Sequence, residues 1–159
     1  MDYFETSIRC LEAAAPALAR RVRDARNITR YRIENAKTGD PTLLVVDKTG
    51  HERLMHSRHD PRREAWRVVE TSIEPDSDSV IVGGFGLAWH IEAILDHAPN
   101  AAVIVVEDDP AVLAAACMAR DLTPLFTSGR IDLALGDRTD DVLTLLEGIG
   151  DNGKGSGDG

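Results

Sequence analysis

Apolar residues near the N-terminus recur at alternating steps of four and three residues, which is the spacing of one face of an amphipathic helix. The members of this stripe are Phe4, Ile8, Leu11, Ala15, Leu18, Val22 and Ala25. Pro16 lies inside the stripe and has no amide proton, so the helix either kinks there or restarts with Pro16 in its first turn. The stripe packs either against its own chain or against a second copy of the chain, so the pattern is compatible with a homodimer.

After the helix the pattern changes to short strands separated by turn residues. The strand-like runs are 31–35, 42–47 and 52–56. They predict a β-meander, and its middle strand is apolar on both faces and should be covered by the helix on one side. Asp60 and Pro61 then begin a second helix, with Asp60 as N-cap and Pro61 at the first helical position.

Strand-like and helix-like runs alternate in the rest of the chain, an order typical of parallel strands joined by right-handed crossovers. The strands are expected at 79–83, 102–107 and 131–135, and the helices at 87–97, 110–120 and 140–147. The sequence thus predicts an α/β fold with three parts. An N-terminal helix, the β-meander and a connecting helix occupy residues 1–74, and a Rossmann-like half domain of three parallel strands with flanking helices occupies 75–147. A disordered tail or linker follows at 148–159.

A glycine-rich turn, Gly83, Gly84, Phe85 and Gly86, joins the first parallel strand to a helix. Such glycines let a ligand approach backbone amides at the positive end of a helix. Glu107 ends the next strand, 107 − 86 = 21 residues further on, where a carboxylate would accept hydrogen bonds from ribose hydroxyls. The pattern predicts a nucleotide-type site, and its alternative is a turn that only allows strand and helix to pack closely.

Three more residues belong to this candidate site. His90 follows the glycines, where its imidazole either reaches a bound phosphate or carboxylate or lies on the surface. Asp137 follows the third strand at the same sheet edge, and it either accepts from an adenine amino group or caps the last helix. Trp89 occupies the place of the last glycine of GxGxxG, and with Phe85 it either stacks on a ligand ring or packs in the core.

Other polar residues predict local structure. His56, Ser57 and His59 lie near one another on an extended segment whose side chains alternate in direction, so they do not form a catalytic triad. Their segment is expected to end the third strand and to position the second helix. Asp109, before Pro110, is expected to cap a helix, and no His, Cys and carboxylate set has the spacing of a metal site.

The charge balance restricts the expected partners. The 18 basic and 27 acidic residues give a net charge of −9 without a basic face, so neither nucleic acid nor a membrane is an expected partner. Cys10 and Cys117 lie far apart, and the sequence has neither a signal-peptide pattern nor a run of eighteen apolar residues. These features predict a soluble, cytoplasmic protein.

Four segments of the sequence, taken in this order and at their distances along the chain, resemble those of a known family. They run from Leu54 to Ala65, which includes His-Ser, Asp-Pro and Glu-Ala, from Val80 to His90, from Val105 to Pro110 and from Arg120 to Leu122. Together they resemble the N-terminal region of the motility accessory factor (Maf) glycosyltransferases, over about residues 28 to 147.

The resemblance implies a β-meander with a Rossmann-like module, followed in family members by a sialyltransferase-like catalytic domain. Members are associated with transfer of nonulosonic acid sugars from CMP-activated donors to Ser and Thr of flagellin. This chain would then be an accessory domain, inactive alone, that recognises flagellin or another acceptor protein for a separate transferase domain, with a nucleotide-sugar as one candidate cofactor.

The alternative is an S-adenosylmethionine-binding, methyltransferase-like protein. In such proteins a glycine turn, an acid after the second strand and a Gly-Asp pair after the third follow one another in the order of Gly86, Glu107 and Gly136-Asp137.

Overall fold

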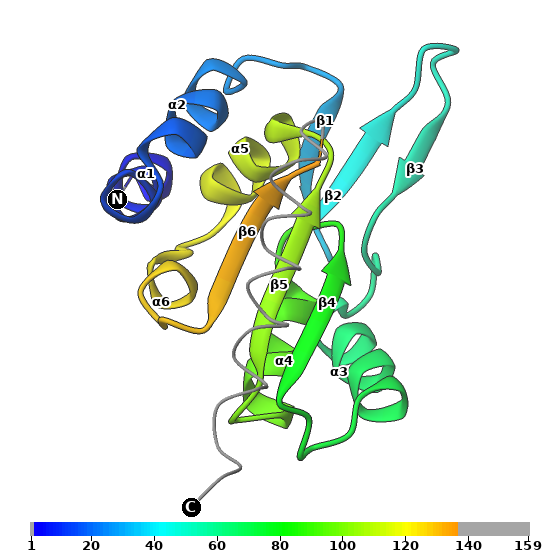
Figure 1. Cartoon of the computed structure of the whole chain (residues 1–159). Helices are drawn as coiled ribbons and strands as arrows, with labels where there is room; N and C mark the ends of the chain where they lie inside the picture. Colours follow the sequence, from blue (N-terminus) through cyan, green and yellow to red (C-terminus); the bar gives the residue numbers. More distant parts are fainter. Residues whose placement is uncertain (1, 137–159) are drawn as a thin grey trace, which may run out of the picture.

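The computed structural model describes residues 2–136, and these form two three-stranded sheets with flanking helices (Figure 1). The elements up to residue 74 are α1 (Tyr3–Ala14), α2 (Pro16–Asp24), β1 (Tyr31–Asn35), β2 (Pro41–Val46), β3 (Glu52–Leu54) and α3 (Pro61–Ser72). They are followed by β4 (Ser79–Gly83), α4 (Trp89–His97), β5 (Ala102–Glu107), α5 (Pro110–Ala119), α6 (Thr123–Phe126) and β6 (Ile131–Leu135). The predicted α/β class is confirmed. The helix expected at 140–147, the tail and Asp137 lie outside the described residues.

The N-terminal stripe forms two helices. α1 ends at Ala14 and α2 restarts with Pro16 at its first position, which was one of the two predicted outcomes. Phe4, Ile8 and Leu11 are at most 4% exposed, so this face of α1 packs inside the chain.

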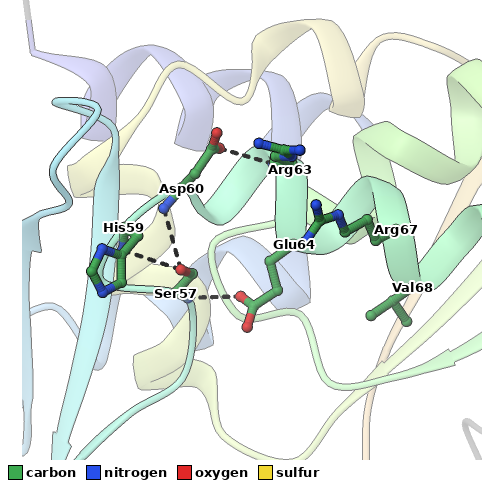
Figure 2. Close-up of a pocket in the computed structure, with 7 residues that line it drawn as sticks. All are labelled: Ser57, His59, Asp60, Arg63, Glu64, Arg67 and Val68. Atoms are coloured by element: carbon green, nitrogen blue, oxygen red, sulfur yellow. Dashed lines mark hydrogen bonds between the residues drawn. The ribbon is translucent and has the colours of Figure 1, made fainter.

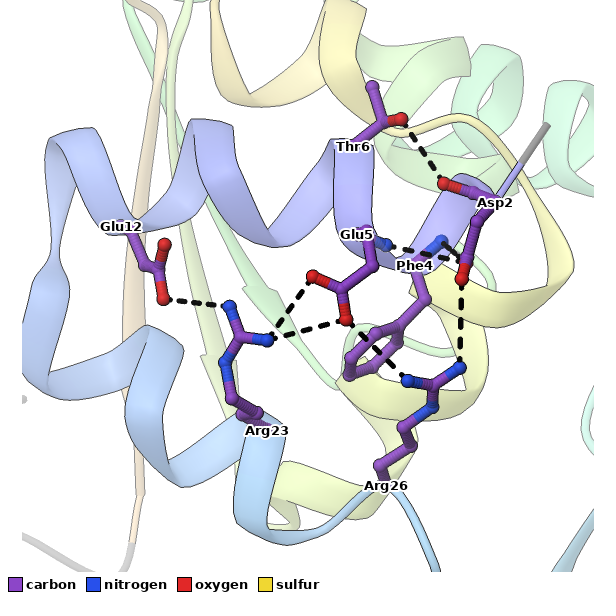
Figure 3. A network of polar contacts seen from close by, with 7 residues as sticks. All are labelled: Asp2, Phe4, Glu5, Thr6, Glu12, Arg23 and Arg26. Carbon is purple, nitrogen blue, oxygen red and sulfur yellow. Dashed lines mark hydrogen bonds and ion pairs between the residues drawn. The ribbon is translucent and has the colours of Figure 1, made fainter.

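Ion pairs also join α1 to α2 and to the residues that follow α2 (Figure 3). Arg23 contacts Glu5 at 3.2 Å and Glu12 at 2.8 Å, and Arg26 contacts Glu5 at 3.5 Å. All these side chains are more than a third exposed, so solvent screens the pairs and each contributes little to stability. The buried stripe is therefore the main attachment of α1 and α2.

The first sheet is the predicted β-meander, with strand order β1-β2-β3 and antiparallel pairing. Leu43 and Leu44 of the middle strand are buried on opposite faces, as their apolar pattern predicted. The turn between β1 and β2 requires Gly39, whose φ of +88° is unfavourable for other residues.

The second sheet has strand order β4-β5-β6, and all its pairs are parallel. Val80 and Val82 of β4 and Val103 and Val105 of β5 face the core with α4 and α5, so the helices cover this face of the sheet. Ile81 points to the opposite face and is 59% exposed. One hydrophobic core contains residues from both predicted parts of the chain, from Phe4 to Leu135.

Arg130 fixes the C-terminal end of α4 to the start of β6. Its guanidinium donates to the carbonyls of Leu95 at 2.9 Å, Ala98 at 2.5 Å and Ala101 at 3.0 Å. The last carbonyls of a helix have no partner within it, so a cation at this place satisfies them and complements the helix dipole.

Candidate functional site

The glycine turn has a shape that few residue types allow. Gly84 and Gly86 have φ of +89° and +52°, in the left-handed region that favours glycine. Ala88 also has a positive φ, +65°, and α4 therefore begins at Trp89, two residues after the predicted start. The turn is closed by the Ala88 N–H, which donates to the Phe85 carbonyl at 2.9 Å.

Glu107 holds the turn from the end of the neighbouring strand. Its side chain is buried, and its Oε2 accepts from the Phe85 N–H at 2.7 Å while its Oε1 accepts from the Asp109 N–H at 2.9 Å. The carboxylate therefore joins the β4–α4 turn to the β5–α5 turn. In its predicted role Glu107 would accept hydrogen bonds from ribose hydroxyls, and it would use the carboxylate lone pairs that these two amides leave free.

His56 comes from the segment after β3 and lies directly against the turn. Its Nε2 accepts from the Leu87 N–H at 2.8 Å. A Cβ at Gly86 would lie 2.7 Å from both Nε2 and Cε1 of His56, so only glycine allows this approach. The imidazole thus occupies an amide that a phosphate would use in a nucleotide-binding turn.

Most amides of the turn already donate within the chain. The Gly84 N–H donates to the Val106 carbonyl at 2.7 Å, and those of Phe85, Leu87 and Ala88 have the partners given above. The Gly86 N–H has no hydrogen-bond partner within residues 2–136.

His90 supports the turn from α4. Its Nε2 lies 3.0 Å from the Gly84 carbonyl, an acceptor, so this nitrogen carries the proton and donates. Burial lowers the pKa of His90, although the hydrogen bond to Gly84 acts in the opposite direction. Burial also lowers the pKa of His56, to about 4, with further contributions from His90 and Arg120. A neutral His56 is what the site requires, because a protonated Nε2 could not accept from Leu87.

Trp89 lies between two arginines. The guanidinium carbons of Arg120 and Arg62 are 3.4 Å and 4.6 Å from its ring centroid, and its Nε1–H donates to the Pro41 carbonyl at 3.0 Å. Arg120 also donates to the Leu87 carbonyl at 2.6 Å and pairs with Glu92. The indole N–H thus attaches α4 to β2 of the meander, and the stacked cations attach α4 to α3 and to the end of α5.

Phe85 is fully buried and stacks on Phe126 at 6.3 Å between centroids. Of the two predicted roles for Phe85 and Trp89, the structure shows packing in the core.

The helix caps are where the sequence predicted them. Asp60 Oδ1 accepts from the Arg63 N–H at 2.9 Å, and Asp109 Oδ1 accepts from the Ala111 N–H at 3.0 Å. Burial raises the pKa of Asp109, but hydrogen bonds from Arg30, Tyr31 and the Ala111 amide outweigh it, so the pKa is lowered overall.

A shallow pocket of about 500 Å³ lies at the start of α3 (Figure 2). Ser57 organises it: its Oγ accepts from the amides of His59 at 3.1 Å and Asp60 at 3.2 Å, and its own N–H donates to Glu64 at 2.7 Å. This confirms that the segment after β3 positions α3. Arg63, Arg67 and Val68 complete the lining.

The structure brings together most of the predicted site residues. Those that meet at the turn are Gly84, Phe85, Gly86, His90 and Glu107. Gly83 is the last residue of β4, and the Gly136 N–H donates to the Glu107 carbonyl at 2.7 Å. Sequence reasoning did not assign His56 and Arg120 to the turn, because no local pattern relates them to residues more than 30 positions away.

No group of three or more His, Cys, Asp or Glu side chains within residues 2–136 could hold a metal ion. None of the helices described there has the length and apolar character needed to cross a bilayer.

No protein-family model matches the sequence, and no curated protein is similar to it. The structure is similar to that of a Maf glycosyltransferase from Magnetospirillum magneticum AMB-1, with a TM-score of 0.63 and 12% identity over 91% of this chain. The fold is Maf-like. This chain spans 29% of the length of that Maf protein, and the similarity shows the fold alone.

Proposed function

We propose that this chain is an accessory domain of a motility-associated glycosyltransferase, which recognises flagellin or another acceptor protein for a separate transferase domain. The observation that carries this proposal is the Maf-like fold over 91% of the chain. The four sequence segments described above resemble the same family independently of the fold comparison.

The geometry of the glycine turn is unfavourable for binding a phosphate. His56 and Glu107 accept from the Leu87 and Phe85 amides, which would otherwise bind a phosphate. A turn whose amides already donate to side chains of the same chain stabilises the fold without any ligand. The domain therefore needs no cofactor for its proposed role.

Calorimetric titration tests this role. Unglycosylated flagellin is expected to bind the wild-type chain, whereas CMP, a CMP-activated nonulosonic acid, S-adenosylmethionine and S-adenosylhomocysteine are expected to give no heat of binding. Failure of flagellin to bind at concentrations of about 100 μM would contradict the proposal.

The same titration tests the nucleotide-type site and the methyltransferase-like alternative. A cofactor that uses the turn should bind His56→Ala more tightly than the wild type, because that variant frees the Leu87 amide. It should bind Glu107→Ala more weakly. A cofactor that binds the wild type with this pattern would show that the turn is a cofactor site and would overturn a role without a cofactor.

A further inference from the structure

Strand β4 is an edge strand. In the sheet order β4-β5-β6 it pairs on one side with β5, and no described strand lies on its other side (Figure 1). In doubly wound α/β folds the first strand of the unit is an inner strand, with the fourth strand parallel to it on this free side. No strand of residues 2–136 occupies the place of that fourth strand.

The pairing with β5 leaves a row of backbone groups free. The Ala102 N–H donates to the Asp78 carbonyl, and the Gly84 N–H donates to the Val106 carbonyl. Because the direction of these groups alternates along a strand, the N–H and C=O groups of Ser79, Ile81 and Gly83 point away from β5. None of these three residues has another backbone partner within residues 2–136.

The edge also lacks the protection found at the other described edges. Arg32 and Glu34 lie on β1, Glu52 and Arg53 on β3, and Asp132 on β6, and charges of this kind prevent pairing with foreign strands. β4 has the sequence SVIVG, without charge or proline. At its centre, Ile81 is 59% exposed, the highest value among the exposed large hydrophobic residues.

Acidic residues lie immediately before this uncharged strand. Glu74, Asp76 and Asp78 are exposed, and they form no ion pair within residues 2–136. A strand that paired with β4 in the parallel direction would begin beside these carboxylates. Basic residues at its N-terminal end would therefore be favoured.

We propose that the free edge of β4 accepts a fourth, parallel strand from a partner polypeptide. The partner segment has one or two Lys or Arg residues followed by about five uncharged, β-branched residues. Its backbone pairs with Ser79, Ile81 and Gly83, and one apolar side chain covers Ile81. This inference depends on the sheet alone and not on the proposed function.

A second copy of this chain is a poorer match for the edge. Identical strands would pair in the antiparallel direction about Ile81, which would place uncharged Gly83 of the partner copy, and no basic residue, beside the acidic residues. Figure 1 also shows α3 and the strands β2 and β3 on the same side of the molecule as this edge. A single extended segment meets fewer obstacles there than a second folded chain.

A labelled peptide of sequence KKTVIVT provides the test, with EETVIVT as the charge-reversed control. Fluorescence anisotropy is expected to show saturable binding of KKTVIVT to the wild-type chain and at least tenfold weaker binding of EETVIVT. Ile81→Lys should weaken binding at least tenfold, because it adds a charge to an exposed position of the edge. Ile33→Lys on β1 is the matched control, since Ile33 is also exposed, and it should bind as the wild type does.

Amide hydrogen exchange locates the peptide. Exchange of the Ser79, Ile81 and Gly83 amides is expected to slow at least tenfold on binding. Exchange of the Val80 and Val82 amides should change little, because these N–H groups already point toward β5. Absence of binding at 1 mM peptide, equal binding of both peptides, or protection elsewhere would overturn the proposal. So would a concentration-dependent dimer of the chain that Ile81→Lys abolishes, because a second copy would then be the occupant.

Discussion

Replacement of Gly86 by alanine tests the contact between the meander and the glycine turn. Alanine at φ +52° costs about 1–2 kcal/mol in backbone strain. Its Cβ would lie 2.7 Å from the His56 ring, so the imidazole has to move and the Leu87 N–H loses its acceptor. An unpaired buried amide costs about 1–3 kcal/mol. The expected loss of unfolding free energy is therefore about 2–5 kcal/mol, a large part of the stability of a domain this size.

Urea unfolding at pH 7.5, followed by circular dichroism, measures this loss. Gly84→Ala is the matched control, because Gly84 also has a positive φ, +89°, but a Cβ there would have no atom within 4 Å. Gly84→Ala should therefore lose only the unfolding free energy that corresponds to the backbone strain. In a His56→Ala background, Gly86→Ala should lose only that strain as well. If Gly86→Ala and Gly84→Ala destabilise equally in the wild-type background, the His56 contact has no energetic importance and the reasoning is wrong.

Three further outcomes follow from buried charges and thiols. The pKa of His56, lowered from 6.5 to about 4, makes the unfolded chain bind more protons between these pH values, so stability is full above pH 6.5 and falls toward pH 4, by at most about 3 kcal/mol. Urea unfolding of His56→Gln, which keeps an acceptor but does not titrate, should show a flatter pH profile. Arg130→Met should lower unfolding free energy by about 2–4 kcal/mol, because two carbonyls at the end of α4 and the Ala101 carbonyl before β5 lose a charged donor. An unchanged urea midpoint would contradict this. A thiol reagent at pH 8 should modify Cys10 and spare Cys117, because burial raises the pKa of Cys117 to about 12. Mass spectrometry of the native protein measures the modification of each cysteine, and equally fast reaction of Cys117 would contradict this prediction.

Local patterns predicted the elements of the fold. The helical stripe that contains Phe4 and Ile8, the caps at Asp60 and Asp109, and the change to strand periodicity at residue 31 depend on interactions over a few positions. Such interactions depend on the types of neighbouring residues, so they can be predicted from the sequence. α6 was not predicted, because four residues provide too little periodicity to detect.

The environment of the glycine turn could be predicted only in part. The alternation of strands and helices was enough to place Glu107 beside the turn, since consecutive parallel strands end at the same sheet edge. The partner of the Leu87 amide depends on how the meander docks on the sheet, and 31 residues separate it from His56. The stacking of Arg120 on Trp89 likewise depends on where the end of α5 lies relative to α4, which no local spacing encodes.

His56 has a consequence for any molecule that uses the glycine turn. The imidazole is attached to the same chain, so it competes at an effective concentration in the millimolar range or above, whereas a free ligand competes at its own concentration. If the closed contact is favoured by about 3 kcal/mol, the turn is open in roughly one molecule in 150, and a ligand with an intrinsic Kd of about 1 μM would show an apparent Kd of about 150 μM. The segment after β3 thus competes with any ligand of the turn, and it sets a lower limit on the ligand concentration at which the turn could respond.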